Sequence, residues 1–162
     1  LALAWQGALC YGVQLYFDVE EEAAHAQAAH GDSGLRTPTD LARDLAHALA
    51  DRKPLLVLVS LDRCPFCKAV RDSHLRPLQV ETGQMIVQLD MKSHQLVADF
   101  AGQVVTHDQL IRRWGIRVAP TVLFFGRSGV EVAPRLDGAY LPDFYGAYLE
   151  DRLQIAQRSV GR

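Results

Sequence analysis

A run of five apolar residues at positions 55–59 (LLVLV) constrains the fold of this chain more than any other feature. A strand with apolar side chains on both sides has to be buried on both faces, as happens in sheets that helices cover on either side. Leu41, Leu45 and Leu49 recur at helical spacing just before the run, and they predict a helix over 38–51 that the Thr37 hydroxyl caps. The run is therefore predicted to be the central strand of an α/β protein.

Helical and strand-like segments alternate along the rest of the chain. The expected elements are a helix that begins at Cys64, a strand at 85–89, a helix over 106–115, a strand at 122–125, its antiparallel partner at 130–132, and a last helix opening at Pro142. Thr106 and Gln109 have the spacing of a capping box at the start of the helix over 106–115. The last helix is expected to bury one face that carries Phe144, Tyr145, Tyr148, Leu149, Leu153 and Ala156. This order predicts an α/β fold with a mixed central sheet and helices on both faces.

Composition narrows the range of partners. The chain has 162 residues, of which 49% are hydrophobic and 22% charged, as in an ordinary one-core globular protein. The formal net charge of -2 provides no electrostatic footprint for nucleic acid or for an anionic membrane. Nucleic acid is therefore not an expected partner.

Two of the three cysteines form one Cys64-Pro65-Phe66-Cys67 unit, which indicates chemistry rather than a disulfide-stapled scaffold. At a helix start, the first-turn amides and the helix dipole stabilise a thiolate, so Cys64 is predicted to be the attacking thiol. Cys67 lies about one turn later, where it can attack a mixed disulfide on Cys64. Pro65 fixes its φ angle where no amide is needed, and Phe66 offers an apolar surface beside the sulfur.

A zinc site is the rival interpretation of the motif. Structural zinc needs four ligands, the chain has no second cysteine pair, and His74 is the nearest other candidate. No metal and no cofactor are therefore predicted. A binding module, either a metallochaperone or a docking domain with an incidental dithiol, remains as the alternative to an enzyme.

The first 34 residues differ in character from the rest of the chain. Residues 1–17 carry no charge, and residues 18–34 are acidic and alanine-rich and end in small turn formers. We therefore expect an N-terminal extension or tether over 1–34 and a folded domain over 35–162. The apolar part could be a remnant of an export signal, a truncated membrane anchor, or an N-terminal strand or helix of the fold.

Three segments together resemble the thioredoxin-like family over about residues 37–156. They are the Cys64–Cys67 motif, the segment at 114–125 (WGIRVAPTVLFF), and Leu136-Asp137-Gly138-Ala139 before the last helix. The resemblance implies a thioredoxin-like fold in which Pro120 is a cis-proline facing the dithiol. It also implies that Pro120 and the neighbouring Ala119 bind an extended substrate, together with Pro65 and Phe66.

Two features depart from thioredoxins proper. The residues between the cysteines are Pro65-Phe66 instead of Gly-Pro, and Leu58 stands where that group has a buried aspartate with a proton-transfer role. Glutaredoxins share a Cys-Pro-aromatic-Cys motif, but their Gly-Gly glutathione site is not seen here.

The segment at 92–105 is longer than the cytosolic type of thioredoxin requires. In this respect the chain is similar to the periplasmic thioredoxins of bacterial sulfur oxidation and cytochrome maturation. The resemblance implies a thiol–disulfide oxidoreductase, with reduction favoured slightly over oxidation. The resemblance also implies that such an enzyme acts on protein thiols or disulfides. It further implies that the enzyme receives electrons from an upstream thiol reductant, for which a membrane electron conductor is a candidate. Resemblance and the uncharged N-terminal segment together favour the periplasm, with the cytoplasm as the alternative.

Overall fold

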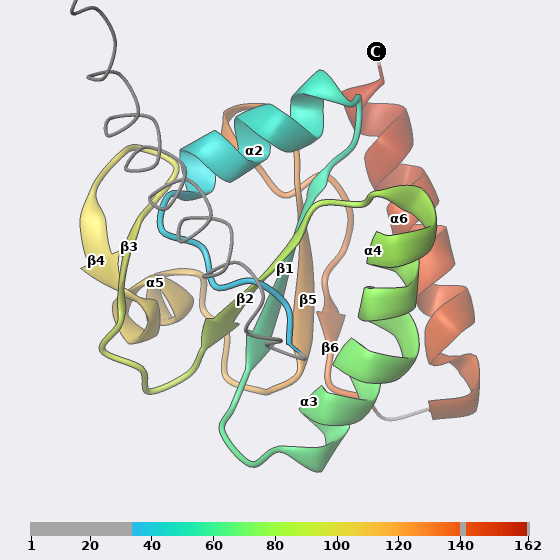
Figure 1. Cartoon of the computed structure of the whole chain (residues 1–162), viewed down its shortest axis with the longest axis horizontal. Coiled ribbons are helices and arrows are strands. Elements are labelled where there is room, and N and C mark those ends of the chain that lie inside the picture. Colours follow the sequence, from blue (N-terminus) through green and yellow to red (C-terminus); the bar gives the residue numbers. More distant parts are fainter. Residues whose placement is uncertain (1–33, 140–141, 162) are drawn as a thin grey trace, which may run out of the picture. The chain divides into compact units, whose positions relative to one another are not determined.

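A four-stranded mixed sheet in the order β2-β1-β5-β6 forms the centre of the structure (Figure 1). Its strands are β1 (Leu55–Ser60), β2 (Ile86–Asp90), β5 (Thr121–Phe125) and β6 (Leu136–Asp137). Strand β1 runs parallel to β2 and antiparallel to β5, and β6 is antiparallel to β5. The computed structural model describes residues 34–139 and 142–161, so the extension predicted over 1–34 lies outside the described residues apart from Gly34.

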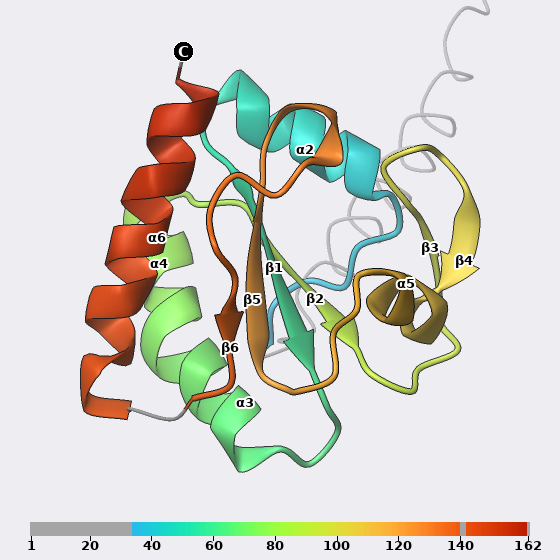
Figure 2. The same cartoon turned by 180° about the vertical axis from the view of Figure 1, so that it is seen from behind.

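Helices cover both faces of this sheet (Figure 2). One face packs against α2 (Leu41–Ala50) and α5 (His107–Arg113). The other packs against α6 (Tyr145–Val160) and a run of helical segments made of α3 (Pro65–Val70), the π-turn η2 (Arg71–Leu75) and α4 (Arg76–Thr82). The predicted α/β, thioredoxin-like arrangement of a mixed sheet between helices is confirmed.

The position of β1 between two helical layers explains why its run of apolar residues is uninterrupted. Leu55, Val57 and Val59 enter the core beneath α2 and α5, whereas Leu56 and Leu58 enter the core beneath α6. All five side chains are fully buried. Successive strand residues point to opposite faces, so a strand between two helical layers needs apolar residues at every position.

The sheet brings the ends of three strands to one edge. Val59 pairs with Thr121, and Ser60 pairs with Asp90. The C-terminal ends of β1 and β2 therefore lie beside the start of β5. The chain leaves the sheet here after β1, at residues 61–64, and enters it again at β5, just after Pro120. Strand ends of this kind are a common position for a functional site.

Helix α2 begins later than predicted, at Leu41, because the residues before it are used for pairing. The Ala98 amide donates to the Thr39 carbonyl at 3.0 Å, and Asp40 forms a bridge with Ala98. Asp40 then caps the helix, and its side chain accepts a hydrogen bond from the Arg43 amide at 3.0 Å. The predicted hydroxyl cap at Thr37 is therefore wrong.

The expected strand at 130–132 is reduced to a single bridge between Phe125 and Glu131. The segment nevertheless pairs antiparallel with the end of β5, as predicted: the Gly126 amide donates to the Val130 carbonyl at 2.8 Å, and the Val132 amide donates to the Phe124 carbonyl at 2.9 Å. Pro134, two residues later, has no amide hydrogen to continue this ladder, and β6 pairs with the start of β5. The connection between β5 and this segment is the short helix η3 (Arg127–Gly129).

A two-stranded hairpin in the segment at 92–105 had no counterpart in the sequence-based prediction. It consists of β3 (Leu96–Ala98) and β4 (Val104–Thr106) and leads into α5. Thr106 and Gln109 form the capping box predicted for that helix, with the Gln109 amide donating to Thr106 Oγ1 at 3.1 Å and the Thr106 amide donating to Gln109 Oε1 at 3.0 Å.

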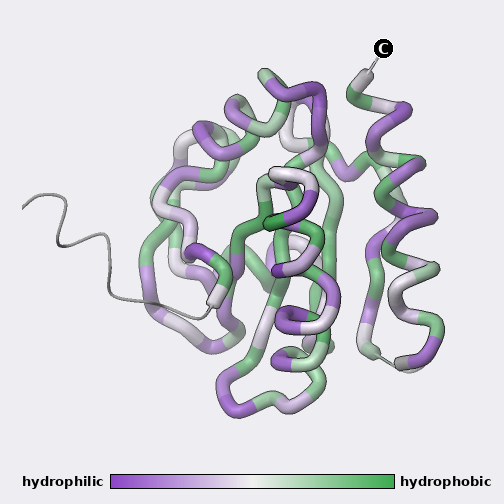
Figure 3. The backbone as a smooth tube through the Cα atoms, turned by 45° about the vertical axis from the view of Figure 1, so that its right-hand side comes forward, coloured by the Kyte–Doolittle hydropathy of each residue, from purple (hydrophilic) through white to green (hydrophobic). Residues whose placement is uncertain are grey.

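The last helix buries fewer aromatic side chains than expected. Tyr145 and Leu149 are buried, but Phe144 and Tyr148 are 60% and 46% exposed. A short 3-10 helix, η4 (Pro142–Phe144), precedes α6, so Phe144 lies outside the regular helical stripe. Figure 3 shows the resulting pattern, with green central strands and an α6 that alternates between green and purple. Among the described residues, no helix is both long enough and apolar enough to span a bilayer.

His107 is a fully buried imidazole at the start of α5. Its Nδ1 accepts a hydrogen bond from the Asp90 amide at 3.2 Å, and no described residue hydrogen-bonds to its Nε2. Burial lowers the pKa of His107 below its usual value of 6.5, and the Asp90 charge opposes this shift only in part. The folded chain therefore holds this ring neutral.

The buried ring predicts a loss of stability in acid. Because the folded pKa of His107 lies below that of the unfolded chain, its contribution is complete above about pH 6.5 and falls as the pH drops toward the folded pKa, by up to about 1.4 kcal/mol per pH unit. Urea unfolding at pH 7, 6 and 5 measures this decline, and His107→Asn should flatten it. Burial also lowers the pKa of His74, so part of the decline will remain.

Replacement of the exposed His47 by asparagine is the control and should leave the acid decline unchanged. Parallel pH curves for the wild type and His107→Asn would contradict the assignment.

Candidate active site

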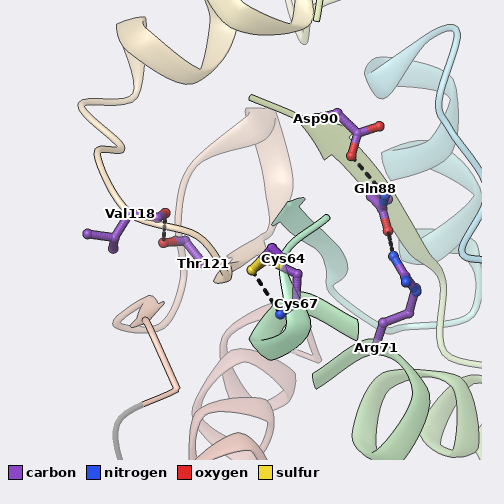
Figure 4. The surroundings of a disulfide bond; sticks show 7 residues. All are labelled: Cys64, Cys67, Arg71, Gln88, Asp90, Val118 and Thr121. Carbon is purple, nitrogen blue, oxygen red and sulfur yellow. Dashed lines mark hydrogen bonds between the residues drawn. A yellow bond between two sulfur atoms is a disulfide. The ribbon is translucent and has the colours of Figure 1, made fainter. Parts of the chain in front are cut away.

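The two cysteines of the motif lie where the chain leaves β1 and enters α3, and a disulfide joins them (Figure 4). Their Cα atoms are 5.2 Å apart. Cys64 is the N-cap residue of α3 and is partly exposed, whereas Cys67, one turn into the helix, is only 1% exposed. Pro65 occupies the first helical turn, as the sequence predicts.

The amides of the first helical turn face the outer sulfur. The Cys67 amide donates to Cys64 Sγ at 3.1 Å, and the Lys68 amide donates to the Cys64 carbonyl at 3.1 Å. In the reduced state, the Cys67 amide and the positive end of the helical run stabilise a Cys64 thiolate. The geometry therefore favours Cys64 as the attacking sulfur.

The two cations beside the motif act on the site less directly than their sequence position suggests. Lys68 Nζ lies 2.5 Å from Asp72 Oδ2, and Arg63 Nε lies 3.6 Å from Asp62 Oδ2. The hydrogen bond from Lys68 lowers the pKa of the Asp72 carboxyl below its usual value, so this carboxylate stays charged. Lys68 therefore shares its charge with Asp72, whereas the solvent-exposed pair of Arg63 and Asp62 is weak.

Phe66 and Pro65 form the outer surface beside the sulfurs. Phe66 is 61% exposed and Pro65 is also exposed. An aromatic ring that remains in solvent next to a partly exposed sulfur provides an apolar contact for a partner chain. Both residues are exposed beside the disulfide, and their substrate-binding role stays a prediction.

The segment before β5 faces the same edge of the sheet. The peptide bond between Ala119 and Pro120 is cis, and the Gly138 amide donates to the Pro120 carbonyl at 2.7 Å. The Thr121 hydroxyl donates to the Val118 carbonyl at 2.9 Å, as Figure 4 shows. These two hydrogen bonds fix the backbone before and after the Ala119–Pro120 peptide bond.

Ala119, which precedes the cis-proline, is partly exposed. Among the residues at 34–139 and 142–161, none forms a hydrogen bond with the Ala119 amide or carbonyl. An unpaired amide and carbonyl beside the end of a strand can pair with an extended chain.

A polar chain of side chains lies on the other side of the disulfide (Figure 4). Arg71 Nη1 donates to Gln88 Oε1 at 3.1 Å, and Gln88 Nε2 donates to Asp90 Oδ1 at 2.8 Å. These residues did not emerge from the sequence-based prediction of the site. A signal for Gln88 and Asp90 was present, because they lie at the end of the strand expected at 85–89 and just after it, and the carboxyl ends of neighbouring parallel strands meet at one edge.

Leu58 stands at the position where the sequence predicts a departure from thioredoxins proper. Its side chain is fully buried in the core that also contains Val70, Leu75 and Phe124. The surroundings of this position are therefore apolar, and no carboxylate occupies it. In the described part of the chain, no three His, Cys, Asp or Glu side chains gather in a way that could hold a metal ion.

Comparison with solved structures finds the same fold at low sequence identity. Thioredoxin O2 from Arabidopsis thaliana in the oxidised state is 13% identical, with 76% of this chain and 99% of that chain covered and a TM-score of 0.50. Thioredoxin f from spinach chloroplast is 22% identical, with 76% and 95% covered and a TM-score of 0.50. A DsbH oxidoreductase is 18% identical, with 76% and 85% covered and a TM-score of 0.50.

The search of curated proteins found no match. A family model described as a thioredoxin-like domain matches residues 41–153, which is more than half of the chain and includes both cysteines and Pro120. The chain therefore belongs to the thioredoxin-like domain family, and its disulfide-bonded Cys64 and Cys67 are consistent with a thiol–disulfide oxidoreductase.

Proposed function

We propose that this chain exchanges disulfides with protein cysteines and works mainly as a reductase. The observation that carries the proposal is the unequal exposure of two bonded cysteines, since Cys64 is partly exposed at a helix start and Cys67 is 1% exposed. A partner in solution can reach only the outer sulfur, and the inner one is held a single turn away. This is the arrangement that attack followed by internal resolution requires.

The proposed reaction moves two electrons from the reduced dithiol to a substrate disulfide. The Cys64 thiolate attacks one substrate sulfur, which breaks the substrate disulfide and releases its other sulfur as a thiolate. Cys67 then loses its proton to solvent, attacks Cys64 Sγ and releases the second substrate sulfur as a thiolate. The released thiolates take up protons, and the enzyme is left with the Cys64–Cys67 disulfide. An upstream dithiol must then return two electrons.

The segment before β5 supplies the surface for a polypeptide substrate. The amide and carbonyl of Ala119, to which no described residue hydrogen-bonds, support pairing with an extended chain, and the buried Pro120 follows it at the sheet edge where β1 ends. Phe66 and Pro65 add apolar contact on the helix side. Backbone pairing gives affinity that does not depend on the substrate's side chains, which suits an enzyme for protein cysteines.

The direction of exchange rests on the residues between the cysteines. Pro65 and Phe66 bring no cation between the sulfurs, and Lys68 shares its charge with Asp72. A very strongly stabilised Cys64 thiolate, which would make the couple a strong oxidant, is therefore not expected.

Equilibration of the full chain in glutathione and dithiothreitol buffers tests this direction. We expect a reduction potential more negative than about -200 mV, toward the value of about -270 mV known for thioredoxin. A potential near -120 mV, the range of strong periplasmic oxidants, would contradict the reductase assignment.

We further propose that the protein is of the periplasmic type associated with sulfur oxidation and cytochrome maturation, and that a membrane electron conductor reduces it. The long segment at 92–105 supports this assignment, and it forms the β3–β4 hairpin. The uncharged residues 1–17 support export. Fractionation of cells that express the full-length gene tests the location, and recovery of all the protein in the cytosol would contradict it.

A further inference from the structure

A groove of about 760 Å³ runs along the disulfide, bordered by both Cys64 and Cys67. Its walls are the β1–α3 loop, the first turns of α3, and the end of β2 with the turn that follows. Figure 4 shows polar residues of these walls on one side of the disulfide and Val118 on the other. A chain that is joined to Cys64 and paired with Ala119 would therefore reach this groove with the residues next to its cysteine.

Cationic side chains outnumber carboxylates in the lining of the groove. The cations are Arg63, Lys68, Arg71 and Lys92, and the carboxylates are Asp62 and Asp90. The whole chain carries a net charge of -2, so the groove is opposite in sign to the protein as a whole. Charges that line a concave site concentrate ligands of the opposite sign.

Two of these cations are fixed by contacts within the protein. Lys68 Nζ and Arg71 Nε lie 2.5 and 3.3 Å from oxygens of the same carboxylate, that of Asp72. Arg71 also donates to Gln88 and is 21% exposed at its side chain, so it forms an ordered part of the wall. One carboxylate cannot neutralise two cations, and a positive charge remains here.

The other two cations are available to a partner. Arg63 and its neighbour Asp62 are about nine-tenths exposed and 3.6 Å apart, and such pairs contribute little. Lys92 is exposed and forms no ion pair with any residue in the described ranges. Two acids lie near Lys92, and both have other partners. Asp90 accepts a hydrogen bond from Gln88 at 2.8 Å, and Asp108 accepts one from the Lys92 backbone amide at 3.1 Å and pairs with Arg112 at 2.8 Å.

The backbone makes these two positions unusual places for long side chains. Arg63 has a φ angle of 56° and Lys92 one of 62°, in the left-handed region that favours glycine or asparagine. A side chain in this conformation costs about 1 kcal/mol, and glycine would avoid the cost while removing the cation. The cations at both rims of the groove therefore occupy a conformation that disfavours long side chains, as Arg52 does outside the groove.

We propose that this groove binds a carboxylate-rich segment next to the substrate cysteine, so that the enzyme selects acidic polypeptide disulfides. The inference rests on the proposed exchange function and specifies its substrate class. Arg63 and Lys92 contact the acidic side chains at the rims, and Arg71 lies deeper beside the dithiol.

Single-turnover reduction of three peptides tests the proposal. Each peptide has one cysteine in a mixed disulfide with neutral 2-mercaptoethanol, and they differ only in glutamate, glutamine or lysine at the positions that flank the cysteine. The pre-reduced full chain should react with the glutamate peptide roughly tenfold faster than with the lysine peptide at low salt. In 0.5 M NaCl the ratio should approach one.

The double variant Arg63→Gln/Lys92→Gln should bring the low-salt ratio to within about twofold of one. The ratio between peptides is the readout, because any change in Cys64 reactivity affects all three alike. Arg52→Gln is a matched control, since Arg52 is an exposed cation with a φ angle of 57° at a turn outside the groove, and it should keep the wild-type ratio. Equal wild-type rates on all three peptides would overturn this inference alone. A wild-type protein that reduces none of them would overturn the exchange function and this inference together.

Discussion

Replacement of Cys67 by serine should trap substrates on Cys64 as mixed disulfides. Attack by the partly exposed Cys64 remains intact, but the buried sulfur that resolves the intermediate is gone. Release then depends on an external thiol, and loss of a well-positioned internal group slows such a step by at least about a hundredfold. Non-reducing gels of cells that express the variant should show high-molecular-weight bands that disappear on reduction.

Cys64→Ser is the matched comparison and should trap far less, because the remaining sulfur is 1% exposed and lies one turn from the helix end. Cys10→Ser in both backgrounds removes the third thiol from the experiment. Cys67→Ala guards against a folding defect caused by a buried hydroxyl, and circular dichroism compares all variants. Equal trapping by the Cys64 and Cys67 variants would contradict the proposed order of attack and resolution.

Leu58→Asp should destabilise the fold by about 3 kcal/mol or more at pH 7. Leu58 is fully buried in an apolar core, so the substitution removes packing and places a carboxyl where described neighbours such as Val70 and Phe124 cannot solvate it. Desolvation raises the pKa of a carboxyl in such a place above its unfolded value of about 3.9. The folded state then binds more protons than the unfolded state, so the free energy of unfolding falls as the pH rises above about 4, until the raised pKa is passed.

Leu58→Asn is the control, since it has nearly the same shape and cannot ionise. Urea unfolding of both variants between pH 4 and 7 should give curves that diverge as the pH rises, with a slope of up to about 1.4 kcal/mol per pH unit. Parallel curves would show that the aspartate is solvated and that the core around position 58 is less closed than the structure indicates.

Local sequence patterns predicted most elements because their causes are local. The apolar run of β1, the capping box at Thr106, and the start of a helix at the cysteine motif each depend on residues within one or two turns. The errors arise where a distant segment intervenes. Asp40 rather than Thr37 caps α2 because Ala98, far along the chain, pairs with the residues before the helix.

The missed hairpin has a similar explanation. Strands β3 and β4 have three residues each, too few for an alternating pattern to stand out from a loop. Val97 and Val105 are buried because they pack beneath α2 and α5, a contact that no local pattern describes. The strand expected at 130–132 is shorter than predicted, because its ladder to the end of β5 stops before Pro134, and β6 pairs with the start of β5.

The sequence by itself determined the kind of sheet, the placement of Cys64 at a helix start and the spacing that puts Cys67 one turn behind it, because each of these follows from backbone periodicity. Only the tertiary structure decided that Cys67 is buried, that the backbone of Ala119 is left open, and that Arg63, Arg71 and Lys92 line one groove. Burial and concave surfaces arise when strands distant in sequence meet at one edge, and the register that joins Ser60 to Asp90 and Val59 to Thr121 exists only in the folded sheet.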